Sequence, residues 1–146
     1  MARYVTKVRT AKTPQEAFAY MADLRNFTEW DPGVKAVKQA EGSGGGLDAV
    51  FDVTVAGPVG DLTLRYKTEE HDAPRNLLVV ARSTIFTSID RITVEPDGTG
   101  SVVTYDADLR LNGLLRLGDL GLRLVFDRIG DRAAAGLRRV LGGQAA

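Results

Sequence analysis

One stretch, residues 114–142, constrains the fold more than any other because it has the pattern of a single long amphipathic helix. Small residues, Gly130, Ala133, Ala134 and Gly136, lie on or beside its apolar stripe, so the middle of the predicted helix is thin. A helix of this kind either approaches a sheet closely or leaves room for another molecule. The apolar positions recur at three- and four-residue steps: Leu122, Val125, Phe126, Ile129, Ala133, Leu137 and Val140.

The chain before this helix is predicted to consist mostly of strands. Residues 2–10 alternate as a strand does, and Thr13-Pro14-Gln15-Glu16 is typical of a helix start with a capping box. A short helical turn at 26–31 is stopped by Pro32 and Gly33. Six further strands are then expected, at 34–41, 47–56, 62–67, 77–81, 86–95 and 101–111.

Short turns between successive strands favour antiparallel pairing. A sheet with one apolar face must bury that face, and the final helix is the only long element available to cover it. The sequence therefore predicts an α+β fold in which a curved antiparallel sheet of about seven strands wraps around a long C-terminal helix. No internal repeat or linker interrupts the chain, so residues 1–146 are interpreted as one domain.

Composition excludes several functions. The 19 basic residues are balanced by 19 acidic ones, so overall charge does not favour nucleic-acid binding. With no cysteine and only one histidine, His71, a transition-metal site would be atypical. The glycine-rich segment 42–46 lacks the context of a phosphate-binding loop, and no cofactor is expected. No secretory signal or membrane-spanning window is recognised, so we expect a cytoplasmic protein.

Strand register places several polar residues toward the expected core. If Ile92 and Val94 face inward, then Asp90 does as well, and Tyr66 and Tyr105 are inward by alternation. A buried carboxylate is costly unless it is paired. Such groups, if enclosed, would form the polar part of an apolar pocket.

Arg82 is the expected partner of Asp90, because the two lie on adjacent antiparallel strands. Either Leu78 and Val80 face inward with Arg82, or the alternate set that includes Val79 does. The favoured alternative is an ordinary water-exposed ion pair at the sheet end, worth less than about 1 kcal/mol. Trp30 is expected to plug one end of the sheet, a role compatible with lining a ligand entrance.

Four passages of the chain resemble the START-like, Bet v 1-like helix-grip superfamily, and in particular its bacterial polyketide cyclase/dehydrase-like members. They are the N-terminal strand together with the helix start at 13–18, and residues 18–32, 90–98 and 104–113. The resemblance implies a cavity between sheet and helix that different members use for lipids, polyketides, sterols and other apolar molecules. Some relatives are enzymes and many only bind, and no shared catalytic set exists to be carried over.

Three functions follow as hypotheses. The first is a binding module for a hydrophobic or amphipathic small molecule, and the second is an enzyme of the cyclase/dehydratase kind with Asp90 and Tyr105 as catalytic candidates. The third is a protein-interaction module resembling co-chaperones. The sequence assigns neither a ligand identity nor an oligomeric state. The expected ligand-binding residues are Trp30, Tyr66, Arg82, Asp90, Tyr105, Phe126, Ile129 and Ala133.

Overall fold

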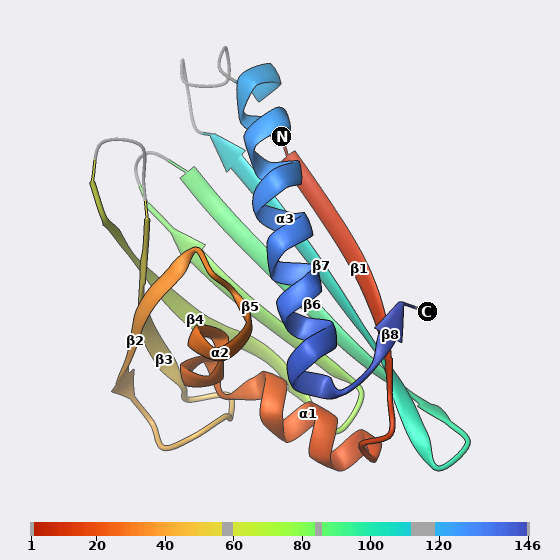
Figure 1. The fold of residues 1–146 in the computed structure, drawn as a ribbon. Helices are drawn as coiled ribbons and strands as arrows, with labels where there is room; N and C mark the ends of the chain where they lie inside the picture. The colour runs from red at the N-terminus through yellow and green to blue at the C-terminus, as the bar shows by residue number, and fades with distance from the viewer. Residues whose placement is uncertain (1, 57–59, 84–85, 112–118, 146) are drawn as a thin grey trace.

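The computed structural model describes residues 2–56, 60–83, 86–111 and 119–145. These residues form a curved antiparallel sheet in the order β2-β3-β4-β5-β6-β7-β1-β8, with helices on its concave face (Figure 1). The helical segments are α1 (Pro14–Ala22), a 3-10 turn η1 (Leu24–Asn26), α2 (Phe27–Trp30) and α3 (Asp119–Leu141). The strands are β1 (Ala2–Thr10), β2 (Val34–Glu41), β3 (Val50–Val55), β4 (Leu62–Asp72), β5 (Asn76–Arg82), β6 (Phe86–Asp97), β7 (Gly100–Leu111) and β8 (Gln144–Ala145).

The predicted α+β helix-grip architecture is confirmed, with all seven long strands in place. The two-residue strand β8, which pairs with β1 after the helix ends, was not predicted. The predicted helix covered 114–142, and its first five positions, 114–118, lie outside the described residues. Among the described residues, no helix is long and apolar enough to cross a membrane.

The first helix begins as its sequence predicts. The hydroxyl of Thr13 accepts a hydrogen bond from the Glu16 amide, and the Glu16 carboxylate accepts one from the Thr13 amide. Pro14 takes the first helical turn, where its missing N–H costs nothing. The apolar face of α1, which includes Phe18 and Met21, is buried against the sheet and closes the lower end of the molecule in Figure 1.

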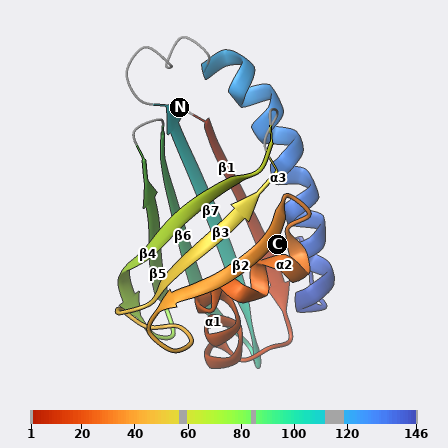
Figure 2. The ribbon, with the colours of Figure 1, turned by 90° about the vertical axis from the view of Figure 1, so that its left-hand side faces the viewer.

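Helix α3 crosses the concave side of the sheet and packs mainly on β1 and α2 (Figures 1 and 2). Its small residues bring the backbones close together. A β-carbon at Gly136 would overlap the carbonyl oxygen of Trp30, and one at Gly130 would overlap the Tyr4 ring. The thin middle of the helix therefore serves close packing at these two positions. Of the two alternatives left open by the thin middle of the helix, close approach holds at Gly130 and Gly136.

The inner face of the sheet is fixed by its continuous register. Leu77, Val79 and Ala81 of β5 lie opposite Ile92, Asp90 and Ser88 of β6. These side chains are buried, and the neighbouring inner positions of β7 continue the same face. Strand pairing holds this register from β4 to β1, with a single irregularity between β4 and β5. The polar residues Ser88 and Asp90 therefore lie on the same face of the sheet as the apolar core, beneath the helices.

Candidate functional site

A chain of four buried polar side chains runs across the inner face of the sheet. The Tyr66 phenol donates a 2.8 Å hydrogen bond to Ser88 Oγ, which in turn donates to Asp90 Oδ1 over 3.4 Å. From the other side, the Tyr105 phenol donates a 2.6 Å hydrogen bond to Asp90 Oδ2. All four side chains are buried. The carboxyl of Asp90 thus accepts hydrogen bonds on both oxygens, directly from Tyr105 and from Ser88, which links it to Tyr66.

Small residues in the sheet make this chain possible. Tyr66 of β4 reaches Ser88 of β6 across the intervening strand because Ala81 stands between them in register. Asp90 lies opposite Ala107 of β7, so Tyr105, one inner position further along, can lean toward the carboxyl. The network therefore results from strand alternation combined with two alanines at the crossing points.

Burial dominates the electrostatics of Asp90 and raises the pKa of its carboxyl to about 7. The hydrogen bond from Tyr105 lowers that pKa, nearby Asp31 raises it, and the Ser88 hydroxyl lowers it again. No cation contributes to this balance among the described residues. A carboxyl of this kind changes protonation near neutral pH and can donate as well as accept a proton.

The expected pairing of Asp90 with Arg82 is wrong. The inner residues of β5 are Leu77, Val79 and Ala81, so Arg82 points to the outer face and is exposed. Its guanidinium instead forms an ion pair with Glu69 of β4. The sequence left both registers of β5 open. The register with Arg82 on the outer face is the one adopted, because a guanidinium on the inner face would have to be desolvated.

A cavity of about 50 Å³ lies between α3, α2 and strands β1 and β7. Five of the expected ligand-binding residues line it, namely Trp30, Tyr105, Phe126, Ile129 and Ala133. Asp90 and Tyr66 lie behind its wall, reached through the hydrogen bonds of Tyr105 and Ser88, and Arg82 is on the opposite face. The complete lining is Tyr4, Thr6, Trp30, Asp31, Tyr105, Ala107, Phe126, Ile129, Gly130, Ala133 and Ala134.

Aromatic rings build one wall of this inner cavity. The Trp30 ring contacts Tyr105 with 5.3 Å between ring centroids and Phe27 with 4.7 Å, in edge-on and tilted arrangements respectively. Trp30 is 2% exposed, and its indole nitrogen has no hydrogen-bond partner within the described part of the chain. On the opposite wall, Ile129 is 42% exposed at the rim, although its position on the helix stripe predicted burial.

Asp31 is a lining residue that the sequence reasoning did not single out. One carboxylate oxygen accepts a 2.9 Å hydrogen bond from the Gly33 amide, and burial raises the pKa of the carboxyl. In the sequence, Asp31-Pro32-Gly33 was interpreted only as a helix stop. A possible signal was its position next to Trp30, because neighbouring residues at a helix end can both face the same cavity.

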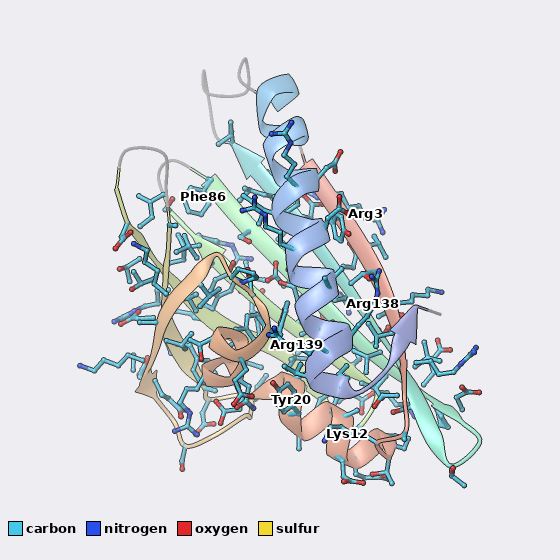
Figure 3. All side chains as sticks on the ribbon, viewed as in Figure 1. Arg3, Lys12, Tyr20, Phe86, Arg138 and Arg139 are labelled. Atoms are coloured by element: carbon cyan, nitrogen blue, oxygen red, sulfur yellow. The ribbon has the colours of Figure 1, made fainter. Side chains whose placement is uncertain are left out.

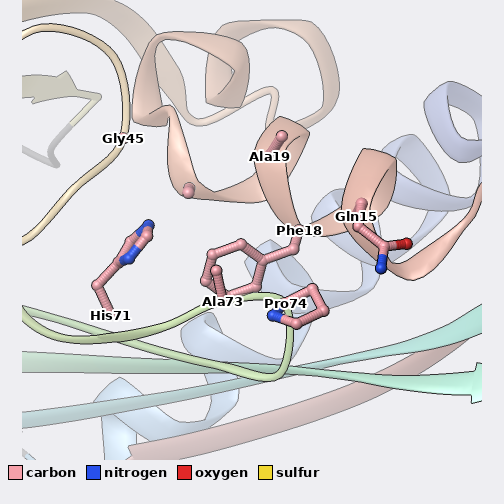
Figure 4. A pocket seen from close by; sticks show the side chains of 8 residues that line it. Gln15, Phe18, Ala19, Gly45, His71, Ala73 and Pro74 are labelled. Atoms are coloured by element: carbon pink, nitrogen blue, oxygen red, sulfur yellow. The ribbon is translucent and has the colours of Figure 1, made fainter.

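A second, larger groove of about 430 Å³ lies outside the sheet–α3 interior, between α1 and the β4–β5 turn (Figure 4). His71 packs edge-on against the Phe18 ring there, with centroids 5.1 Å apart. The groove is open and its lining is otherwise apolar except for Gln15. Over the described ranges, no cluster of three or more histidine, cysteine, aspartate or glutamate side chains is arranged to hold a metal ion.

The curved sheet and the long helix that crosses its concave face define a helix-grip protein. The chain belongs to the family described as polyketide cyclase / dehydrase and lipid transport, whose model matches residues 1–142. No curated protein sequence is significantly similar to the chain.

Solved structures share the same fold at low sequence identity. A START superfamily protein from Mycobacterium smegmatis superposes with a TM-score of 0.77 at 12% identity, covering 97% of this chain and 98% of that one. TTHA0849 from Thermus thermophilus gives 0.75 at 13% identity over 93% and 92% of the two chains. The di-domain ARO/CYC StfQ from the steffimycin biosynthetic pathway gives 0.71 at 16% identity, over 97% of this chain and 49% of that one.

Proposed function

We propose that this protein binds a hydrophobic or amphipathic small molecule between its sheet and α3. The observation that carries the proposal is the Asp90–Tyr105 pair, a buried carboxyl without a counter-cation among the described residues, behind a cavity wall that is otherwise mainly apolar. Burying a carboxyl costs several kcal/mol unless it is paired, and such groups concentrate at functional sites. An apolar pocket with a few converging polar groups is the usual form of a small-molecule site.

The cavity must enlarge to accept such a ligand. At about 50 Å³ it is well below the roughly 300–1,000 Å³ of typical ligand pockets. The α3 wall offers the simplest route, because Ile129 is half-exposed and Phe126 is only partly buried. We propose that these two side chains move outward and form the entrance, while the sheet and Trp30 stay in place.

Several residues in and behind the cavity wall then have distinct roles. Trp30 and Phe126 provide aromatic surface for the ligand, and Ala133 keeps α3 narrow at the point where the ligand is held. Tyr105 presents its phenol to the ligand, with Asp90 fixing the direction of that phenol from behind. Tyr66 acts one step further back, through Ser88.

The single tryptophan of the chain gives a direct assay, because Trp30 lines the proposed site. N-phenyl-naphthylamine, a neutral fluorescent probe, should accept energy from Trp30 in a saturable way. Ala133→Leu should fill the cavity and abolish that signal, whereas Ala135→Leu, the same change on the exposed side of α3, should leave it intact. Circular dichroism confirms that both variants are folded. The absence of saturable transfer in the wild type, or equal binding by both variants, contradicts the proposal.

A second candidate function is acid–base catalysis on a bound ketone, favoured by the pKa of about 7 at Asp90 and its 2.6 Å contact with Tyr105. In the dehydration of a β-hydroxyketone, the carboxylate acting through the phenol would remove the proton next to the carbonyl. The same proton would return to the leaving hydroxyl, so that an enone and water are released.

Diacetone alcohol tests this candidate, because its dehydration to mesityl oxide is visible in the ultraviolet spectrum. The wild type should exceed the buffer rate, Asp90→Asn should fall to it, and Asp48→Asn, a change at an exposed carboxylate, should not differ from the wild type. A wild-type rate equal to that of buffer excludes catalysis of this reaction and leaves the binding function standing.

A further inference from the structure

We infer that the site between the sheet and α3 discriminates by charge, taking neutral or amine-bearing ligands and excluding anionic ones. The inference rests on the proposed binding function and adds the ligand class to it. It is carried by two carboxyls, Asp31 and Asp90, that converge on the cavity, together with the positions of the cations in the described part of the chain.

The two carboxyls approach the cavity from different elements. Asp31, at the end of α2, is itself a lining residue, and its carboxylate accepts a hydrogen bond from the Gly33 amide at 2.9 Å. Asp90, on β6, lies one hydrogen bond behind the wall through Tyr105. They are close enough to interact, since Asp31 raises the pKa of Asp90. A ligand in the cavity therefore meets the field of both groups.

No lysine, arginine or histidine is among the described residues that line the cavity. Arg3 and Arg82 are held on the outer face by Asp106 and Glu69. None of the α3 arginines whose side chains are described lines the cavity. Arg128 and Arg132 are exposed, and Arg139 donates to the Glu29 carbonyl oxygen on the α2 side (Figure 3). Arg138 acts on the lining residue Tyr4 from the β1 side of the helix, where the Tyr4 phenol donates to Asp131.

An anionic group in this cavity would be desolvated without a counter-ion and would lie beside two carboxyls. An unpaired buried charge is strongly unfavourable, so a fatty acid or a sulfonate should be rejected even when its apolar part fits. A neutral ligand meets better partners. The buried indole nitrogen of Trp30 has no partner in the described structure and can donate to a ligand oxygen, and Asp31 can accept from a hydroxyl or an ammonium.

Protonation of Asp90 should weaken the exclusion of anionic ligands at low pH. The groups that act on Asp90 are Tyr105, Asp31, Ser88 and, more weakly, Asp106, and none of them is a cation. Tyr66, whose own pKa is raised first by burial and then by Asp90, stays neutral. Below neutral pH, Asp90 is uncharged and the repulsion falls to that of Asp31 alone. Binding of an anionic probe should therefore strengthen as pH is lowered, while binding of a neutral probe should not.

A matched pair of dyes tests the inference. N-phenyl-naphthylamine and anilinonaphthalene sulfonate share one aromatic frame and differ by the sulfonate. Transfer from Trp30, the single tryptophan, reports dye bound to the protein, and the part of the transfer that Ala133→Leu abolishes belongs to the site between the sheet and α3. At about pH 8, where Asp90 is mostly ionised, the neutral dye should bind at least about tenfold more tightly than the sulfonate, a difference of about 1.4 kcal/mol. Asp31→Asn or Asp90→Asn should narrow this ratio, and the exposed control Asp48→Asn should leave it unchanged.

The outcomes separate the two levels of the proposal. Equal affinity for the two dyes in the wild type overturns charge selection while binding between sheet and helix stands. A ratio that neither Asp31→Asn nor Asp90→Asn changes also overturns it. No saturable transfer with either dye contradicts the binding function itself, and with it the selection.

Discussion

The Tyr105 phenol donates a 2.6 Å hydrogen bond to Asp90 Oδ2 between neighbouring strands, with both side chains buried beneath the helices. This bond stabilises the ionised carboxylate and lowers its pKa, but desolvation outweighs it and the pKa of Asp90 is raised to about 7. The pair therefore combines a carboxyl that is easily neutralised with a tyrosine side chain that lines the cavity.

Asp90 should make the protein less stable as pH rises. In the unfolded chain this carboxyl loses its proton near 3.8, whereas in the folded protein it keeps the proton until about 7. Between these values the folded state binds more protons, so the free energy of unfolding falls as pH increases and levels off above about 7. The difference corresponds to a few kcal/mol, at about 1.36 kcal/mol per pKa unit.

Urea denaturation of wild type and Asp90→Asn across this range checks the expectation. The variant lacks the ionisation, so its stability should depend less on pH and should exceed that of the wild type at about pH 8. Asp48→Asn, at an exposed position, serves as the control and should keep the wild-type slope. A variant with an unchanged slope would show that Asp90 does not titrate in this window.

Tyr105→Phe should raise the pKa of Asp90 further, because it removes the hydrogen bond that most favours the carboxylate. Carbon-detected NMR of the Asp90 carboxyl, titrated with pH, measures the shift directly. Above neutral pH, the variant should also lose about 1–3 kcal/mol of stability, the usual cost of leaving a buried polar group without its partner. A lower pKa in the variant would contradict the hydrogen bond as assigned.

Gly136→Ala should destabilise the fold by roughly 2–4 kcal/mol, because the added methyl overlaps the Trp30 carbonyl oxygen. The intrinsic helix preference of alanine, about 1 kcal/mol, does not offset this overlap. Thermal unfolding measures the loss. Ala135→Gly, on the exposed side of the same helix, should cost only about 1 kcal/mol, which separates overlap with α2 from helix propensity.

Arg82→Ala should change stability by less than about 1 kcal/mol, because its ion pair with Glu69 is on the solvent-facing side of the sheet. Probe binding should also be unaffected. The same titration with N-phenyl-naphthylamine tests this expectation, and a marked loss of affinity would place the guanidinium at the site after all.

Periodicity was sufficient for the fold. Alternation in the strands and the capping box at Thr13 placed the elements, because hydrophobic pattern and local hydrogen bonding act over short stretches of sequence. It also placed Asp90 and Tyr105 on one face. Arg82 was misplaced because a one-residue slip exchanges the two faces of a strand, and β5 is apolar on both.

Long-range contacts were the part that sequence could not provide. The close approach of Gly136 to Trp30 and of Gly130 to Tyr4 depends on how α3 crosses β1 and α2, which no local pattern encodes. The partnership of Tyr66 with Ser88 likewise depends on Ala81 standing between their strands. Asp31 acquires its position from the end of α2, where the sequence showed only a helix stop.

The position of a bound ligand tests the central claim most directly, because the molecule offers both the inner cavity and the larger outer groove. Intermolecular NOEs from N-phenyl-naphthylamine to alanine methyl groups distinguish them. Contacts with Ala107 and Ala133 are predicted, since these methyls line the space between the sheet and α3. Contacts with Ala19 and Ala73, which line the groove beside His71, would show that the ligand binds outside the grip and would contradict the proposed function.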